Sequence, residues 1–141
     1  MVVLKIQKLH PDAILPHYSR EGDAAMDLYS IEDVTIKPKE RVAVGTGIAT
    51  EFDKNHVLLY RDRSGLAFKH GITALGGVFD SNYRGEHKVI LLNTGDEAYT
   101  IHKGDRIVQF IVLEKPHIEI EEVTDLSDSN RGENGFGSSG K

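Results

Sequence analysis

The chain has 141 residues, enough for one domain with a buried core. It contains no cysteine, which excludes disulfides, thiolate metal sites and a cysteine nucleophile. Its formal net charge of -5 argues against broad binding to nucleic acid, which requires a basic surface. The N-terminal residues do not resemble a signal peptide, and no stretch approaches the roughly 20 apolar residues of a membrane span. We therefore expect a cytoplasmic protein that binds neither nucleic acid nor membrane.

Short runs of β-forming residues follow one another along the chain. The run at 107–113 is nearly all apolar, which is typical of a strand buried on both faces. Turn-forming clusters separate many of the runs. This pattern predicts an all-β fold of the sandwich, barrel or jelly-roll class. In chain order the predicted strands lie at 2–7, 34–36, 42–44, 56–61, 88–93, 99–102, 107–113 and 118–121.

One stretch, residues 64–70, favours a short helix instead. It contains Leu, Ala and Lys as helix formers, Ser64 stands near its start, and Gly71 is a stop signal. Arg63, Ser64 and Gly65 together offer a guanidinium, a hydroxyl and backbone N–H groups, which suit an anion site. A helix start next to a surface arginine is the simpler interpretation of the same residues.

Residues 127–141 are rich in Gly, Ser and Asn and cannot bury enough apolar surface to order themselves. We therefore predict a β-domain at 1–126 and a flexible C-terminal arm at 127–141. A frayed terminus is the simpler interpretation. Alternatively, the arm closes over a ligand, with Arg131 on an anion and Phe136 on a ring.

Residues 76–86 form a second candidate segment. Gly76 and Gly77 let the backbone approach a flat ligand closely, so a hairpin there could read a base edge. Asp80 follows two apolar residues and, in a partly dry pocket, could act as a general base on water. Tyr83 offers a ring for a sugar or a base. A plain β-hairpin explains the spacing equally well.

Two polar residues have apolar neighbours on both sides in the sequence or lie in an apolar strand. Asp27, between Met26 and Leu28, needs a charged partner or a nearby metal ion if it points inward. Gln109 needs partners for its amide, either backbone or ligand. In both cases a hydrogen-bonded structural residue is the simpler interpretation. The seven histidines show no metal-ligand spacing, so we expect them to be structural or at the surface.

Taken in order and with their spacing, five segments resemble the trimeric dUTPase family over essentially the whole chain. They are AAMDLYS at 24–30, RSGLAFKHG at 63–71, GGVFDSNYRGE at 76–86, GDRIVQFI at 104–111 and RGENGFGSSG at 131–140. The resemblance implies a jelly-roll-like β-fold with one short helix and a homotrimer whose active sites are shared between subunits. It also implies Mg²⁺-dependent hydrolysis of dUTP to dUMP and pyrophosphate.

The resemblance implies a role for each matching residue. Asp80 would activate water for attack on the α-phosphorus, Tyr83 would pack on the deoxyribose, and Asp27 would hold Mg²⁺ through water. The backbone of Gly76, Gly77, Val78 and Phe79 would read the uracil edge, with Lys88 as a further base contact. Arg63, Ser64, Gly65 and Gln109 would hold the phosphates, while Phe136 would cover the uracil and Arg131, Gly137 and Ser138 would bind the γ-phosphate.

Five positions depart from the usual family pattern without removing a group assigned to chemistry. They are Ala25, Asp62, Asn82, Asn134 and Ser139.

Two other functions compete with this interpretation: deamination of dCTP on the same fold, and a non-catalytic nucleotide-binding protein. The hairpin argues against a deaminase, because Ser81 and Asn82 follow Asp80 where deaminases typically have Pro-Gly. The presence of both Asp80 and the arm argues against a non-catalytic protein.

Overall fold

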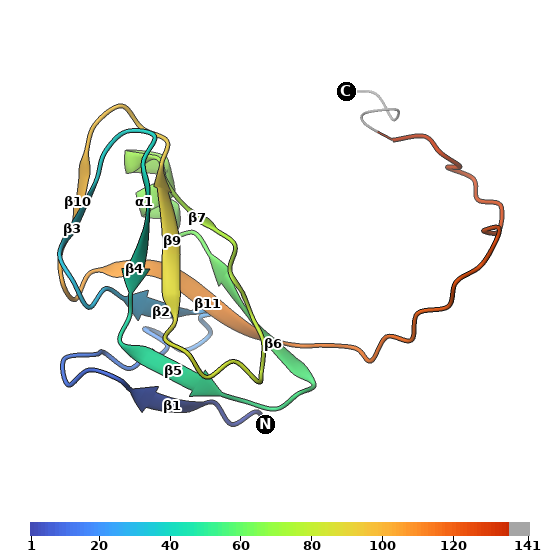
Figure 1. The fold of residues 1–141 in the computed structure, drawn as a ribbon, viewed down its shortest axis with the longest axis horizontal. Coiled ribbons are helices and arrows are strands. Elements are labelled where there is room, and N and C mark those ends of the chain that lie inside the picture. Colours follow the sequence, from blue (N-terminus) through green and yellow to red (C-terminus); the bar gives the residue numbers. More distant parts are fainter. Residues whose placement is uncertain (136–141) are drawn as a thin grey trace.

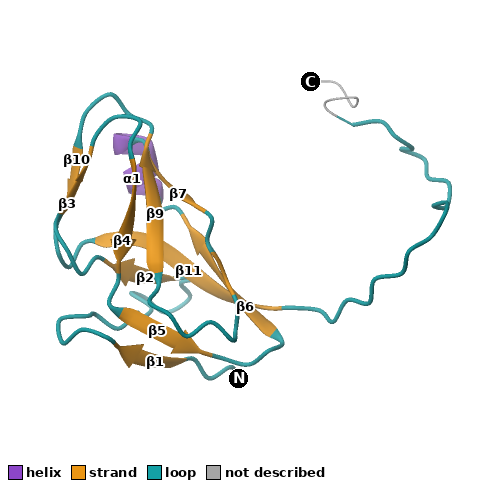
Figure 2. Ribbon diagram, in the orientation of Figure 1, coloured by secondary structure: helices purple, strands orange, loops and turns teal. Residues whose placement is uncertain are grey.

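The computed structural model describes residues 1–135. Within them the chain forms short strands and a single seven-residue helix, with the helix at one end of the strands (Figure 1, Figure 2). The predicted all-β fold with one short helix is therefore confirmed. In chain order the elements are β1 (Lys5–Lys8), β2 (Met26–Tyr29), β3 (Val34–Ile36), β4 (Arg41–Gly45), β5 (Ile48–Glu51), β6 (His56–Arg61), α1 (Ser64–His70), β7 (Ile72–Leu75), β8 (Val78–Phe79), β9 (Lys88–Asn93), β10 (Tyr99–Ile101) and β11 (Arg106–Glu114).

The strands of the described chain pair antiparallel in two larger and two small sheets. One larger sheet has the order β2-β11-β6-β8 and the other has the order β4-β9-β7, while β1 pairs with β5 and β3 with β10. Strands that follow one another in sequence often lie in different sheets, as β4 and β5 do. This crossing between sheets gives the jelly-roll-like character of the fold.

The hydrophobic core lies between the two larger sheets. Leu28, Leu58 and Phe110 contribute from the first sheet, and Val89 and Leu91 contribute from the second; each is at most 1% exposed. Burial of a side chain of this size stabilises the fold by roughly 1.5–3 kcal/mol relative to exposure. The core therefore holds the sheets in a fixed relation, on which the position of the site depends.

Most predicted elements appear at the predicted residues. β6 and β9 cover 56–61 and 88–93, and α1 covers 64–70 before ending at Gly71, whose φ of 67° is left-handed. A glycine suits this φ because it has no Cβ to collide with the backbone.

The strand predicted at 107–113 is buried on both faces only at its start. Ile107 and Val108 are buried, but of the residues that follow in β11 only Phe110 is fully buried. The second face of the strand is partly open, so the apolar run alone overstated its burial.

The predicted strand at 118–121 does not form in the single chain. After β11 the described residues 115–135 run away from the sheets without regular structure (Figure 1). Ile118 is 71% exposed and Ile120 is 91% exposed. A strand requires a partner for its N–H and C=O groups, and the body of this chain provides none there. The division into a domain at 1–126 and an arm at 127–141 stays a prediction.

No helix in the described residues is long and apolar enough to cross a membrane.

A buried histidine joins three strands behind the hairpin at 76–86. The ring of His87 is 1% exposed, and both ring nitrogens are paired: Nε2 with Thr50 Oγ1 at 2.8 Å and Nδ1 with the Tyr60 hydroxyl at 2.9 Å. Phe79 stacks on the ring with centroids 4.4 Å apart. Burial lowers the pKa of His87 to about 4. The histidine is therefore a neutral structural residue near neutral pH.

We predict that His87 makes the fold sensitive to acid. Below its ordinary pKa of about 6.5 the unfolded chain binds a proton that the folded chain excludes, so stability falls as the pH drops from about 6.5 to 4. The maximum loss is roughly 3 kcal/mol. Denaturant unfolding of the wild type and of His87→Gln, at pH 7.5 and pH 4.5, measures it. The wild type should lose more stability than the variant over this interval, and equal losses would contradict the assignment.

Candidate active site

A pocket of about 530 Å³ opens at one edge of the β2-β11-β6-β8 sheet. Its charged lining comprises three arginines and two aspartates, so the side chains carry one net positive charge in an otherwise acidic protein. Such a focused positive site attracts anions. The lining residues are Ser19, Arg20, Asp23, Ala24, Ala25, Asp27, Arg63, Ser64, Gly65, Arg106 and Gln109.

Strand register explains why these distant residues meet. Asp27 on β2 lies opposite Gln109 on β11, and Gln109 lies opposite Arg61 at the end of β6. The turn from β6 into α1, which carries Arg63, therefore leaves the sheet at the level of Asp27. The sequence segments 24–30, 63–71 and 104–111 thus contribute to one pocket.

The carboxylate of Asp27 lies between two arginines. Its Oδ1 is 3.0 Å from Arg63 Nε, and its Oδ2 is 3.4 Å from Arg106 Nη1. The Asp27 side chain is only 15% exposed, so these partners offset the cost of burying its charge. Sequence reasoning gave Arg106 no role, although this residue lies in the same segment, 104–111, as Gln109.

The start of α1 leaves polar groups open to the pocket. Arg63 occupies the N-cap position and no side chain caps the helix, so Ser64 is the first helical residue and not a cap. An added Cβ at Gly65 would meet no atom within 4 Å. The Ser64 hydroxyl and the first-turn N–H groups are therefore available to an anionic ligand.

Gln109 has a backbone partner, as the simpler interpretation expected. Its Nε2 donates to the carbonyl oxygen of Asp62 at 2.8 Å. The Asp62 carboxylate in turn accepts from the Thr73 hydroxyl and from the Ala74 N–H, both at 2.7 Å. Sequence reasoning gave Asp62 no role, and its only signal was an acidic residue between two arginines at a strand-to-helix junction.

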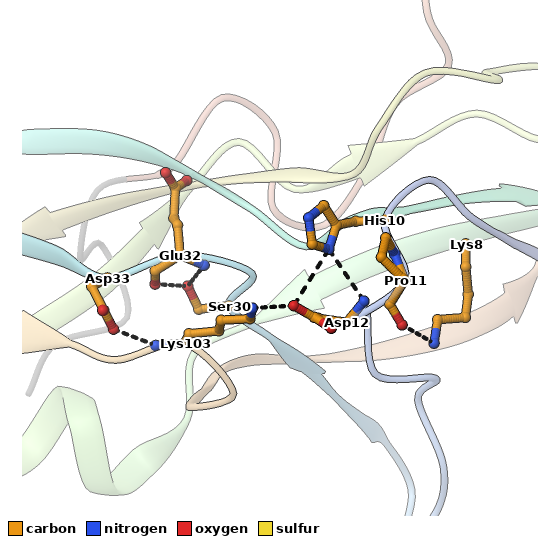
Figure 3. Close-up of polar contacts among 8 residues, drawn as sticks. All are labelled: Lys8, His10, Pro11, Asp12, Ser30, Glu32, Asp33 and Lys103. Atoms are coloured by element: carbon orange, nitrogen blue, oxygen red, sulfur yellow. Dashed lines mark hydrogen bonds and ion pairs between the residues drawn. The ribbon is translucent and has the colours of Figure 1, made fainter.

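The long loop before β2 is fastened to the turn between β10 and β11. Lys103 forms an ion pair with Asp12, and its main-chain N–H donates to Asp33 Oδ1 at 2.8 Å (Figure 3). The hydrogen bond from Lys103 lowers the pKa of Asp12. Lys8 Nζ also donates to the carbonyl oxygen of Pro11 at 2.7 Å. The contacts of Asp12 and Pro11 hold the loop before β2, whose later residues Ser19, Arg20, Asp23, Ala24 and Ala25 line the pocket.

The hairpin that carries Asp80 begins with two glycines in the left-handed region. Gly76 has a φ of 74° and Gly77 has a φ of 98°. The Gly77 carbonyl accepts the Tyr60 N–H at 2.8 Å, and a Cβ added to Gly77 would lie 3.1 Å from Tyr60 Cβ. The backbone of Val78 and Phe79 then pairs with β6.

Asp80 is exposed in the single chain, so the body of one chain does not itself provide the partly dry pocket. It lines a separate hollow together with His56 and Lys115. Tyr83 is 43% exposed; its hydroxyl donates to the Glu86 carbonyl at 3.1 Å and its ring meets the edge of Phe79. The burial expected for Asp80 therefore requires atoms from outside this body.

Asp80 and the arginine pocket lie toward opposite ends of β6. Phe79 lies opposite Leu58, whereas Arg63 follows Arg61 at the other end of the strand. The five residue steps from position 57 to position 62 span roughly 16 Å in a strand. One chain therefore does not bring Asp80 and Tyr83 to Arg63.

The remaining predicted residues lie apart from both clusters. Lys88 begins β9, and its side chain is 61% exposed and lies 3.9 Å from a Glu86 oxygen. Arg131 Nε donates to the Asn134 carbonyl at 2.7 Å within the extended C-terminal segment. Phe136, Gly137 and Ser138 lie outside the described residues.

The match to a family model decides the relationship: the dUTPase model matches residues 11–140. The chain belongs to the dUTPase family.

Two similar proteins show how far the likeness extends. The chain is 51% identical to the deoxyuridine 5'-triphosphate nucleotidohydrolase of Nautilia profundicola, covering 98% of this chain and 99% of that protein. The structure of the Staphylococcus bacteriophage 80alpha dUTPase with dUpNHpp has a TM-score of 0.93 and 27% identity, covering 99% of both chains.

A more distant dUTPase shares the fold and was described with a metal ion. It is the phage phi11 enzyme of S. aureus, in a structure that details the coordination of a structural Mg(II) ion. Its TM-score is 0.84 at 21% identity, and the match covers 89% of this chain. In this dUTPase-family chain, residues 1–135 contain no group of three or more acidic or histidine side chains arranged to hold a metal.

The geometry of the hairpin generates a prediction. Gly77→Ala places a Cβ against Tyr60 in a backbone conformation that side chains rarely adopt, so we expect a loss of about 1–3 kcal/mol in stability. Thermal unfolding measures it. Gly135→Ala, where a Cβ meets nothing within 4 Å, is the control and should leave the unfolding temperature unchanged. An equal effect of both substitutions would contradict the prediction.

Proposed function

We propose that this chain hydrolyses dUTP to dUMP and pyrophosphate by attack of water on the α-phosphorus. The observation that carries the proposal is the arginine-rich pocket. The chain that forms this pocket is 51% identical to a deoxyuridine 5'-triphosphate nucleotidohydrolase. The reaction limits uracil in DNA and supplies dUMP for thymidylate synthesis. A cytoplasmic location stays a prediction.

The pocket at the start of α1 binds the triphosphate. Arg63, Ser64 and Gly65 surround it with a guanidinium, a hydroxyl and open backbone N–H groups, which suit phosphate oxygens. Gln109 lies beside them and supports the turn through its bond to Asp62. Phosphate hydrolysis depends mainly on positioning and charge neutralisation, so these groups supply a large share of the catalysis.

The hairpin provides the base site and the catalytic carboxylate. Asp80 accepts a proton from the attacking water, and Tyr83 packs against the deoxyribose. The backbone of Gly76, Gly77, Val78 and Phe79 hydrogen-bonds the uracil edge. A wrong base would leave buried polar groups unpaired, which discriminates strongly. Lys88 adds a further base contact.

A homotrimer with shared sites reconciles the separation of the two clusters. The hairpin of one subunit would face the arginine pocket of another, which would also bury the exposed Asp80. The outer face of the β4-β9-β7 sheet supports association, since Ala43, Ile90 and Leu75 form an exposed apolar row across it. The exposed Ile118 and Ile120 would find strand partners on a neighbouring subunit.

The C-terminal arm closes the site. In the proposed division, residues 1–126 complete the β-domain within the trimer and residues 127–141 form the arm. Phe136 covers the uracil, while Arg131, Gly137 and Ser138 bind the γ-phosphate. A closed arm excludes water from the reaction, and its opening releases the products.

Magnesium fits the pocket as a partner of the substrate and not as an ion in a protein cage. Mg²⁺ commonly uses one or two carboxylates together with substrate phosphates and water. Asp27 and Asp23 both line the pocket. Asp27 would hold the ion through water. When bound, Mg²⁺ neutralises charge on the phosphates. The two arginines keep the Asp27 carboxylate oriented toward the pocket.

The shared site predicts complementation between two inactive variants. Asp80→Asn removes the general base, so kcat should fall by about 10²–10⁴-fold while dUTP still binds. Arg63→Ala removes a phosphate ligand from the other half of the site. Trimers assembled from a mixture of the two variants contain sites with one intact half from each, and pyrophosphate release from dUTP should recover.

Each variant alone, unfolded and refolded in the same way, is the control for complementation. No recovery in mixtures that sediment as three chains would contradict the shared site. Full turnover by Asp80→Asn would contradict the assignment of the base. Ammonia release from dCTP without pyrophosphate release from dUTP would indicate a deaminase instead.

We further predict that truncation before Arg131 leaves a folded protein with the same sedimentation and a severely reduced turnover of dUTP. Turnover should fall because the removed residues close over the substrate in the proposed mechanism. The fold should persist because the last strand of the core, β11, ends before the truncation. Thermal unfolding and pyrophosphate release measure the two properties. Undiminished activity after the truncation would contradict the proposed closure.

A further inference from the structure

Asp62 connects three elements around the start of α1. Its carboxylate accepts hydrogen bonds from β7 with both oxygens: Oδ2 from the Thr73 hydroxyl and Oδ1 from the Ala74 N–H, each at 2.7 Å. Its main-chain carbonyl accepts the Gln109 side-chain amide of β11 at 2.8 Å. The residue therefore fixes the turn from β6 into α1 on two sides.

The contacts of Asp62 are hydrogen bonds that support the turn, and not ion pairs. Although Arg61 and Arg63 flank it, Asp62 forms no ion pair within residues 1–135. Both carboxylate oxygens are used by neutral donors. The described lining of the pocket includes Arg63 but not Asp62.

The residues directly after Asp62 carry the polar groups of the pocket. Arg63 pairs with Asp27 and also donates from Nη1 to the Arg106 carbonyl at 3.2 Å. Ser64 and Gly65 open α1 and have no side-chain cap to hold them. The position of Arg63, Ser64 and Gly65 therefore depends on Asp62, which precedes them, and on its bonds to β7 and β11.

We propose that Asp62 is a positioning residue that holds Arg63, Ser64 and Gly65 in place for the phosphates through its two bonds to β7. The inference rests on the proposed function, since it takes these three residues as the phosphate site. The pocket depends on the two hydrogen bonds between the Asp62 side chain and β7 and on their direction, and not on the negative charge of Asp62.

Two substitutions at position 62 separate geometry from charge. Asp62→Ala removes both acceptors and should raise the KM for dUTP by about tenfold or more. Asp62→Asn keeps one oxygen for the Ala74 N–H, and its amide can donate to the Thr73 hydroxyl, which can also accept. It should therefore restore the KM to within about threefold of the wild type.

Thr73→Val removes one of the two bonds from the partner side and keeps Asp62. It should raise the KM for dUTP by less than Asp62→Ala does. It also tests the inference if Asp62→Ala fails to fold. Asp96→Ala and Thr100→Val remove an exposed carboxylate and an exposed hydroxyl elsewhere, and both should behave as the wild type.

Two inhibitors of dUTP hydrolysis distinguish a local effect from general loosening. Inorganic pyrophosphate probes the phosphate site, and its inhibition constant should rise in Asp62→Ala and Thr73→Val in parallel with the KM. Deoxyuridine, which has no phosphate, should inhibit these variants and the wild type alike. Equal weakening of both inhibitors would overturn the inference, as would an Asp62→Asn variant as impaired as Asp62→Ala.

The inference and the proposed function fail in different ways. Wild-type protein that releases no pyrophosphate from dUTP would overturn both. Normal wild-type turnover with an unchanged KM in Asp62→Ala and Thr73→Val would overturn only the role of Asp62.

Discussion

The pairing of β11 with β2 and β6 is the constraint on which the pocket depends. Antiparallel register places Asp27 opposite Gln109 and Gln109 opposite Arg61, so three distant segments of the chain reach the same sheet edge. The buried Val108 and Phe110 anchor β11 in the core. Because a slip of one residue would turn every side chain of β11 to its other face, the core and the pocket share one register.

The net charge of the pocket lining is opposite in sign to the net charge of the whole molecule. The protein carries a net charge of -5, yet its pocket holds three arginines around two aspartates. Asp27 keeps Arg63 and Arg106 in fixed positions without neutralising the site. An acidic protein can therefore still present one focused positive site that suits an anionic ligand.

The hairpin shows a different kind of organisation. Behind it, His87, Phe79 and Tyr60 form a buried polar and aromatic support with both ring nitrogens of His87 paired. In front of it, Asp80 stands exposed. A rigid support behind an open carboxylate suits a surface that a second subunit covers, in agreement with the proposed trimer.

The sequence by itself determined the local elements and the family. Residues 56–61, 64–70 and 88–93 form the predicted strands and helix because their periodicity and stop signals are local properties. Five ordered segments indicated the dUTPase family, which the family match confirms. The roles of the individual site residues stay proposals.

Only the tertiary structure decided which side chains meet. The pairing of Asp27 with Arg63 and Arg106, the bonds of Asp62 to β7 and the exposure of Asp80 depend on strand register and on contacts between distant segments. Periodicity reports which face of a strand is apolar, but not which strand lies beside it. For the same reason the alternating residues 118–121 predicted a strand that the single chain does not form, because a strand exists only where a partner accepts its hydrogen bonds.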